Sequence, residues 1–157
     1  KGKTTDASDG PEDLLNALLE MRGDDFTLTD IRVYLTDIFA AGSDTTAKTM
    51  EWAMAELIRN PERMKRAQAE LDQVVGRKRR VEESDTDRLP YLCAVVKEAF
   101  RLHPVVPLLV PHRADSDCEI EGLLIPKHTQ VIVNMWAIGR DPAIWNEPSE
   151  FVPERFL

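Results

Sequence analysis

Apolar side chains recur every three or four positions through much of the first half of the chain. The stripe runs through Leu28, Ile31, Leu35, Ile38, Phe39, Gly42, Thr46, Met50, Ala53 and Leu57. This spacing predicts one helix over residues 27–60, because side chains three and four apart share a face. Thr27 and Asp30 are suited to cap its start, and Asn60-Pro61 ends it. At 1.5 Å per residue the helix is roughly 48 Å long. We therefore expect polypeptide outside this chain to complete its packing.

The remaining sequence divides into shorter elements. The sequence predicts a loop and a short helix in residues 1–26. In residues 61–104 it predicts two more helices, separated by a charged loop that follows Gly76. Residues 105–157 are rich in prolines and short apolar runs, which predicts small strands at Cys118–Ile120, Leu123–Ile125 and Gln130–Asn134. The expected fold is mainly α with a small β region, in a single partial domain over residues 1–157.

Composition narrows the class of protein. The 157 residues are 43% hydrophobic and 31% charged, which is ordinary for a soluble globular chain. Twenty Lys and Arg against 28 Asp and Glu give a net charge of −8, which argues against a nucleic-acid surface. The one basic run, Arg77–Arg80, precedes several acids and favours a solvated loop. Two cysteines and three histidines show no metal-ligand spacing. No apolar run approaches the roughly 20 residues of a membrane span.

The middle of the long helix is built from poor helix formers. Residues 40–46 read Ala-Ala-Gly-Ser-Asp-Thr-Thr, although Gly costs about 1 kcal/mol against Ala and Ser, Asp and Thr compete for backbone hydrogen bonds. Local conflicts of this kind are typical of functional sites. We expect the helix to open locally at Gly42, beside an acid and a hydroxyl, to admit a small ligand and a proton. The alternative is a close helix crossing at Gly42.

Two further motifs contain arginine. Glu98 and Arg101 lie three positions apart on the polar side of the third helix, so they can pair or jointly bind another group. Residues 151–156 read Phe-Val-Pro-Glu-Arg-Phe, which predicts an irregular turn around Arg155. The alternatives are an exposed ion pair contributing about 0.3–0.5 kcal/mol and an ordinary surface turn.

Together these motifs resemble the cytochrome P-450 family. Ala41 to Thr46 match the oxygen-groove signature of the family's I helix, and the other two motifs follow in the family's order. The resemblance implies a partial cytochrome P-450 fold, with the I, J and K helices and short strands. It implies a buried triad of Glu98, Arg101 and Arg155, which requires arginines because a guanidinium makes planar, multidentate hydrogen bonds.

The resemblance also assigns roles to single residues. Asp44 and Thr45 would move protons during oxygen activation, and Ala41, Gly42 and Thr46 would complete the oxygen groove. Arg113, with His112 as a weaker neighbour, would bind a haem propionate, although an ordinary ion pair with solvent-exposed groups is the alternative for Arg113. The substrate-contacting residues would be Phe39, Ala40, Val106, Leu108 and Leu109.

The implied function is insertion of one oxygen atom from O₂ into an apolar small molecule, such as a plant terpenoid. Electrons would come from NADPH through cytochrome P-450 reductase, a flavoprotein, at the cytosolic face of the endoplasmic reticulum membrane. The membrane anchor and the haem-binding cysteine, in the pattern Phe-x-x-Gly-x-Arg-x-Cys-x-Gly, would lie outside this chain, the cysteine beyond Leu157. The isolated chain is therefore expected to be inactive, with no metal ligand of its own. One alternative is a naturally truncated, non-catalytic interaction module, and another is a helical binding protein with chance motifs.

Overall fold

The computed structural model describes residues 13–23 and 25–157. The chain divides into two compact units, residues 1–44 and 45–157, whose boundary falls within the longest helix. Each unit is described by itself. The expectation of a single partial domain remains a prediction.

The first unit contains α1 (Leu14–Glu20) and the beginning of α2 (Leu28–Arg59). Asp13 caps α1 by accepting a hydrogen bond from the Asn16 backbone N–H at 2.9 Å. Asp30 accepts from the Thr27 backbone N–H at 2.8 Å, while the Asp30 N–H donates to the Thr27 hydroxyl at 3.4 Å. This reciprocal pair is the predicted cap of the long helix. The hydroxyl and N–H of Thr27 hold the pKa of the Asp30 carboxyl below its ordinary value.

The second unit contains the other elements: α3 (Pro61–Val74), the 3₁₀ helix η1 (Glu83–Arg88), α4 (Pro90–Leu102), β1 (His112–Arg113), β2 (Cys118–Ile120), β3 (Leu123–Ile125), β4 (Gln130–Val131), α5 (Met135–Ile138) and the 3₁₀ helix η2 (Pro153–Phe156). Gly76 follows α3 with φ +73°, the left-handed conformation expected of a helix terminator. The strands form two antiparallel pairs, β1 with β4 and β2 with β3. The mainly helical fold with a small β region is thus as predicted.

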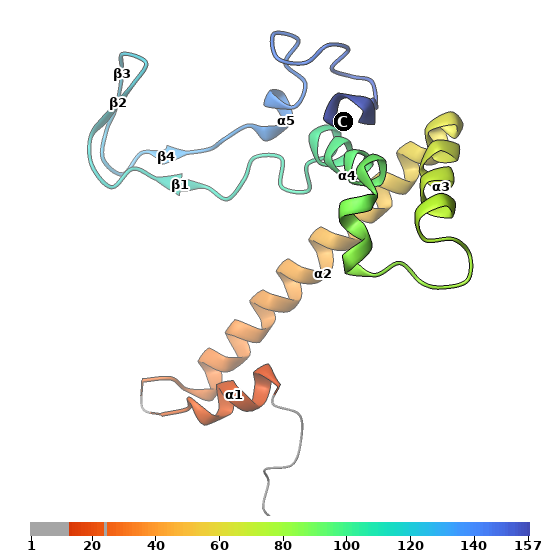
Figure 1. Ribbon diagram of the computed structural model, residues 1–157. Coiled ribbons are helices and arrows are strands. Elements are labelled where there is room, and N and C mark those ends of the chain that lie inside the picture. Colours follow the sequence, from red (N-terminus) through yellow and green to blue (C-terminus); the bar gives the residue numbers. More distant parts are fainter. Residues whose placement is uncertain (1–12, 24) are drawn as a thin grey trace, which may run out of the picture. The chain divides into compact units, whose positions relative to one another are not determined.

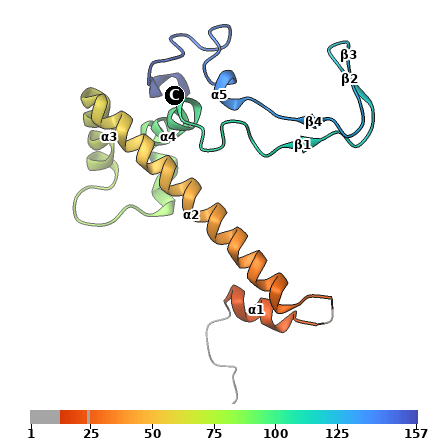
Figure 2. The same ribbon diagram turned by 180° about the vertical axis from the view of Figure 1, so that it is seen from behind.

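The core of the second unit lies around α4. Figures 1 and 2 show from opposite sides that α4 lies beside α3 and the C-terminal turn η2, and α4 contacts both. The buried cluster comprises Leu57, Ala67, Tyr91, Val95, Ala99, Leu102 and Phe151. Each large apolar side chain buried there contributes about 1.5–3 kcal/mol. Because α2, α3, α4 and the C-terminal segment all supply core residues, this packing fixes the backbone from which the candidate site is built.

Two elements, α5 and η1, lie in segments for which the sequence predicted no helix. Helix α5 begins after Asn134, whose side chain accepts a hydrogen bond from the Ala137 N–H at 3.0 Å. In η1, Asp85 is only 1% exposed and pairs with Arg79 and Arg88. One arginine of the basic run therefore neutralises a buried acid, which charge patterning alone could not locate.

Candidate functional site

Glu98 is the centre of a buried hydrogen-bond network. Its carboxylate accepts from Arg101 Nε and Nη2 at 2.7 and 2.8 Å and from Arg155 Nε at 3.1 Å. The backbone N–H of Val152 donates to the same carboxylate at 2.7 Å. Glu98 is 0% exposed and Arg101 is 7% exposed. The expectation that this pair lies on the polar side of its helix is therefore wrong, and the alternative of an exposed ion pair is excluded.

The two arginines also bind backbone carbonyl groups of the segment that covers them. Arg101 donates to the carbonyl oxygens of Gly139, Pro148 and Glu150. Arg155 donates to those of Asn146 and Glu147. Burying charges is favourable only when further hydrogen bonds satisfy them, and these carbonyls supply that compensation. The polar contacts explain why Glu98 and Arg101 lie on the buried face of α4.

Trp145 covers the same network. The guanidinium carbons of Arg101 and Arg155 lie 5.3 and 5.9 Å from its ring, and its indole N–H donates to the Ile138 carbonyl at 3.0 Å. The ring also lies 5.8 Å from that of Phe156. An indole face attracts cations, so Trp145 adds to the forces that orient both arginines. Sequence reasoning did not single out this residue, because its signal was only an isolated Trp in a Pro-rich segment.

The segment after α5 fits closely against the C-terminal end of α4. A Cβ atom at Gly139 would overlap the Arg101 carbonyl oxygen, so this position requires glycine. Arg140 donates to the Leu102 carbonyl at 2.6 Å and lies 4.6 Å from the Trp136 ring. Burial, and secondly the charge of Arg101, lower the pKa of the Arg140 guanidinium.

The turn that carries Arg155 is also bound through its neighbour Glu154, which contacts α3 and α4. Glu154 accepts from Arg66 Nη1 at 2.9 Å and from the Tyr91 hydroxyl at 3.2 Å. Pro153 is buried, so the alternative of an ordinary surface turn is excluded. Burial, followed by the nearby charge of Glu154, raises the pKa of Tyr91 to about 12. Neighbouring residues 154 and 155 thus bind different partners, which fixes the orientation of the turn.

The oxygen-groove motif lies within α2. The helix is continuous through Gly42, so the expected local opening is not observed. Helix formation is cooperative, and the turns on both sides sustain the backbone through one unfavourable residue. A Cβ added at Gly42 would meet no atom within 4 Å in the described part of the chain, so no close crossing occurs there either. Phe39, Ala40, Ala41 and Asp44 are exposed on the same helix.

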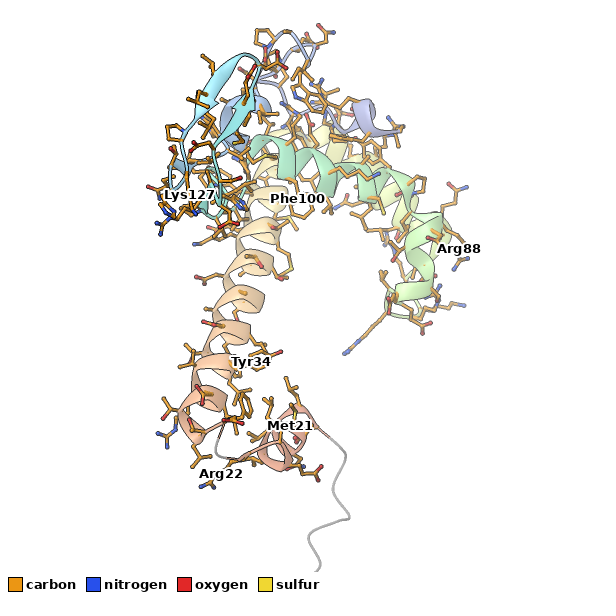
Figure 3. All side chains as sticks on the ribbon, turned by 90° about the vertical axis from the view of Figure 1, so that its left-hand side faces the viewer. Met21, Arg22, Tyr34, Arg88, Phe100 and Lys127 are labelled. Carbon is orange, nitrogen blue, oxygen red and sulfur yellow. The ribbon has the colours of Figure 1, made fainter. Side chains whose placement is uncertain are left out.

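An apolar groove runs between the second half of α2 and α4. Its volume is about 360 Å³, and it is lined by Thr45, Thr46, Thr49, Met50, Ala53, Val96 and Phe100. Figure 3 labels Phe100 on α4. Thr49 donates its hydroxyl hydrogen to the Thr45 carbonyl at 2.8 Å. The structure thus places two of the predicted groove residues, Thr45 and Thr46, beside the helix that carries Glu98 and Arg101.

The other predicted site residues lie between α4 and β4. His112 and Arg113 form β1, exposed and paired with Val131 and Gln130. Val106, Leu108 and Leu109 are 43%, 48% and 39% exposed. Leu109 has φ 52°, a left-handed conformation that is strained for a leucine. The apolar side chains of this loop and the guanidinium of Arg113 are therefore accessible to a ligand.

The described residues offer neither a metal-binding cluster nor a membrane-spanning helix. No group of three or more His, Cys, Asp or Glu side chains in residues 13–23 and 25–157 could bind a metal ion. Within the same residues, none of the helices is both long and apolar enough to cross a membrane.

Comparison with known proteins identifies the family. The cytochrome P-450 family model matches residues 1–157. Cytochrome P-450 76C4 of Arabidopsis thaliana is 57% identical over 148 residues, which are 92% of this chain and 29% of that protein. Geraniol 8-hydroxylase of Swertia mussotii is 51% identical over 149 residues, 93% of this chain and 30% of that protein.

Solved structures agree with the relatives. A zebrafish cytochrome P-450 determined with progesterone is 44% identical, with a TM-score of 0.84 over 94% of this chain and 36% of that one. The chain thus spans about 30% of the length of the curated relatives it matches. The match over every residue, the identity to plant members and the shared fold together show that the chain belongs to the cytochrome P-450 family.

Proposed function

We propose that this chain is part of a haem-thiolate monooxygenase that hydroxylates an apolar small molecule of the terpenoid class. The observation that carries the proposal is the buried network of Glu98, Arg101 and Arg155, in a chain that belongs to the cytochrome P-450 family. The overall reaction is R–H + O₂ + NADPH + H⁺ giving R–OH + H₂O + NADP⁺. The terpenoid class is supported by similarity to a protein named geraniol 8-hydroxylase.

The residues present fit a haem group. A haem needs an apolar surface for its ring and cationic donors for its propionates, and the chain offers accessible apolar side chains and Arg113. When bound, the group supplies the redox chemistry that activates O₂. Arg113 would bind a propionate, with His112 as a second donor. The cysteine that would hold the haem iron would come from the loop Phe-x-x-Gly-x-Arg-x-Cys-x-Gly, which we expect after residue 157.

The residues of α2 would control protons beside the haem. The Thr45 hydroxyl would hold a proton within hydrogen-bond reach of O₂, and Asp44, which is exposed, would carry protons from solvent. Ala41, Gly42 and Thr46 would shape the space around them. Phe39 and Ala40 would contact the substrate, as would three residues that follow α4, Val106, Leu108 and Leu109. All five of these side chains are apolar, which suits a terpenoid better than a charged substrate.

The partners follow from the reaction. The enzyme would receive electrons from NADPH through cytochrome P-450 reductase. By analogy with the plant members that it resembles, the full protein would be held at the cytosolic face of the endoplasmic reticulum by an anchor outside this chain.

Two experiments test the proposal. The first extends the coding sequence past Leu157 and searches it for Phe-x-x-Gly-x-Arg-x-Cys-x-Gly; a stop codon or an unrelated sequence there would overturn the proposal. The second expresses the full-length protein with a plant reductase and measures hydroxylated geraniol formed per NADPH consumed.

Thr45→Ala is the informative variant in the second experiment. We expect it to lower the product-to-NADPH ratio about tenfold or more, with the lost electrons recovered as hydrogen peroxide. Thr36→Ala is the matched control, because Thr36 is exposed on the same helix and its hydroxyl donates to the Arg32 carbonyl at 2.8 Å. An equal ratio in both variants would remove Thr45 from the proposed chemistry.

A further inference from the structure

His103 contacts α2 through two different forces. Its ring is stacked on that of Trp52, with centroids 4.0 Å apart and planes 2° apart. Its Nε2 lies 2.8 Å from Glu56 Oε1, which requires the proton on Nε2 if the ring is neutral. Neither contact belongs to the Glu98 network or to the proposed oxygen chemistry.

The carboxylate of Glu56 is buried, which is unusual for an acidic side chain. The Glu56 side chain is only 9% exposed, and the His103 side chain is 17% exposed. A buried carboxylate is costly unless it is hydrogen-bonded or paired. The remaining neighbours are weaker, since Asn60 Nδ2 lies 3.5 Å from Oε2 and Arg59 Nη1 lies 4.0 Å from Oε1. His103 is therefore the principal partner of the Glu56 carboxylate.

The geometry of the pair suits it to fix one helix on another. Trp52 and Glu56 are four positions apart on α2, so they lie on one face, separated by about 6 Å along the axis. His103 directly follows α4, and its backbone N–H donates to the Ala99 carbonyl at 2.8 Å. Sliding α2 along α4, or rotating it, would therefore break the stack, the hydrogen bond or both.

Apolar packing between these helices does not by itself define their register. Leu57 of α2 belongs to the buried cluster that includes residues of α4, and Ala53 packs against that cluster, but such contacts are non-directional. A hydrogen bond to a buried charge is directional, and losing it leaves that charge unsatisfied. The same two helices form the walls of the groove that contains Thr45 and Thr46.

We propose that His103 is a positioning residue that sets the register of α2 on α4, and thereby the position of Thr45 relative to the Glu98 helix. Its catalytic consequence rests on the proposed monooxygenase function. Displacing Thr45 by a fraction of an ångström would misplace its hydroxyl and divert electrons from product to hydrogen peroxide, without removing any group that reacts.

The test uses the full-length holoenzyme with its reductase and geraniol as the probe substrate. His103→Phe keeps a ring to stack on Trp52 but removes the donor to Glu56, whereas His103→Gln keeps an N–H donor and removes the ring. His128→Asn is the control, because His128 is exposed in a turn with φ 71°, which asparagine tolerates. The readout is product per NADPH, after subtraction of the NADPH that the reductase consumes alone, a ratio that does not depend on how much enzyme is folded.

We expect His103→Phe to lower this ratio at least threefold, His103→Gln to restore part of it, and His128→Asn to leave it unchanged. An unchanged ratio in His103→Phe would overturn the proposal.

Unfolding midpoints of His103→Phe, Glu56→Gln and the double variant give a second readout that needs no turnover. Non-additive shifts support the contact, and additive shifts overturn it. If the wild-type protein bound no haem or consumed no NADPH, the proposed function would be refuted. The unfolding midpoints would still show whether His103 and Glu56 interact.

Discussion

At the scale of single residues, the carboxylate of Glu98 connects three parts of the second unit. It binds the side chain of its own helix at Arg101, the side chain of η2 at Arg155 and the backbone of Val152 between them. Full burial makes each of these hydrogen bonds stronger than at the surface and makes the loss of one partner costly.

Replacing Arg101 with lysine should therefore destabilise the protein although the charge is kept. One ammonium group cannot reproduce the bidentate pair with Glu98 together with three bonds to backbone carbonyls. We expect Arg101→Lys to lower the free energy of unfolding by about 2–4 kcal/mol, measured by denaturant titration of the full-length protein. Arg32→Lys, at an exposed position of α2, should change it by less than about 0.5 kcal/mol. Equal effects would mean that the network contributes little.

Asp85 should make stability depend on pH in the acid range. Hydrogen bonds from Arg79 and from the Glu82 N–H hold the pKa of its carboxyl well below the ordinary value of about 3.9. Because the folded pKa is lowered, its contribution to stability is present above about pH 4 and is lost as the pH falls further toward the folded pKa. Between pH 5 and pH 2, the midpoint temperature of thermal unfolding should therefore fall further in the wild type than in Asp85→Asn. Parallel curves would contradict the assignment.

At the scale of elements, both ends of α4 are bound by side chains from distant segments. The two oxygens of Glu70 in α3 accept from the backbone N–H groups of Tyr91 and Leu92, both at 2.9 Å. At the other end Arg140 donates to the Leu102 carbonyl. These partners satisfy backbone groups that a helix end leaves unpaired, and they hold Glu98 and Arg101 at fixed positions.

Glu70→Ala should destabilise the protein, because it removes the acceptor of the Tyr91 and Leu92 N–H groups. Two N–H groups at the start of α4 would lose their acceptors, which we expect to lower the free energy of unfolding by about 1–2 kcal/mol. Glu62→Ala is the control on the same helix, since Glu62 is exposed and pairs only at the surface with Lys65 at 2.8 Å. Equal losses in thermal or denaturant unfolding would show that Glu70 is not a cap.

Local patterns explain which elements could be predicted from the sequence. The helix over residues 27–60 and the strands Cys118–Ile120 and Leu123–Ile125 follow from periodicity and short apolar runs, and the structure has all three. The buried face of α4 could not be read in this way, because Glu98 and Arg101 interrupt its apolar stripe and their compensating carbonyls lie some 40 to 50 residues later. The caps by Glu70 and the contacts of Trp145 also join distant residues, and only the fold brings these together.

Gly42→Ala in α2 should raise stability but lower product formation. Alanine meets no neighbouring atom there and removes the propensity penalty of glycine, so we expect the free energy of unfolding to rise by up to about 1 kcal/mol. If Gly42 provides space for oxygen beside Thr45, product formed per NADPH should fall in the same variant. Gly23→Ala also meets no atom within 4 Å and lies outside this helix, so it should leave product formation unchanged.

At the scale of the whole molecule, the chain is about 30% as long as the curated relatives it matches. Several large apolar side chains are half or more exposed, including Phe39 at 71% and Met50 at 63%. In the full-length protein we expect further segments to cover them, and one of these to carry the cysteine that binds haem iron. The two cysteines of this chain offer a direct test of that expectation.

We expect neither Cys93 nor Cys118 to act as the thiolate ligand of the haem iron. Cys93 lies in α4 with its sulfur 3.7 Å from the Thr86 carbonyl oxygen, and a carbonyl does not stabilise a thiolate. Cys118 is exposed in β2, opposite Ile125. The 157-residue chain mixed with haem should therefore show no thiolate-type Soret band when reduced under carbon monoxide. In the full-length protein the band should appear, persist in Cys93→Ser and Cys118→Ser, and vanish when the cysteine of the expected loop is replaced. Loss of the band in either of the first two variants would move the iron ligand into this chain and overturn the placement of the haem site beyond it.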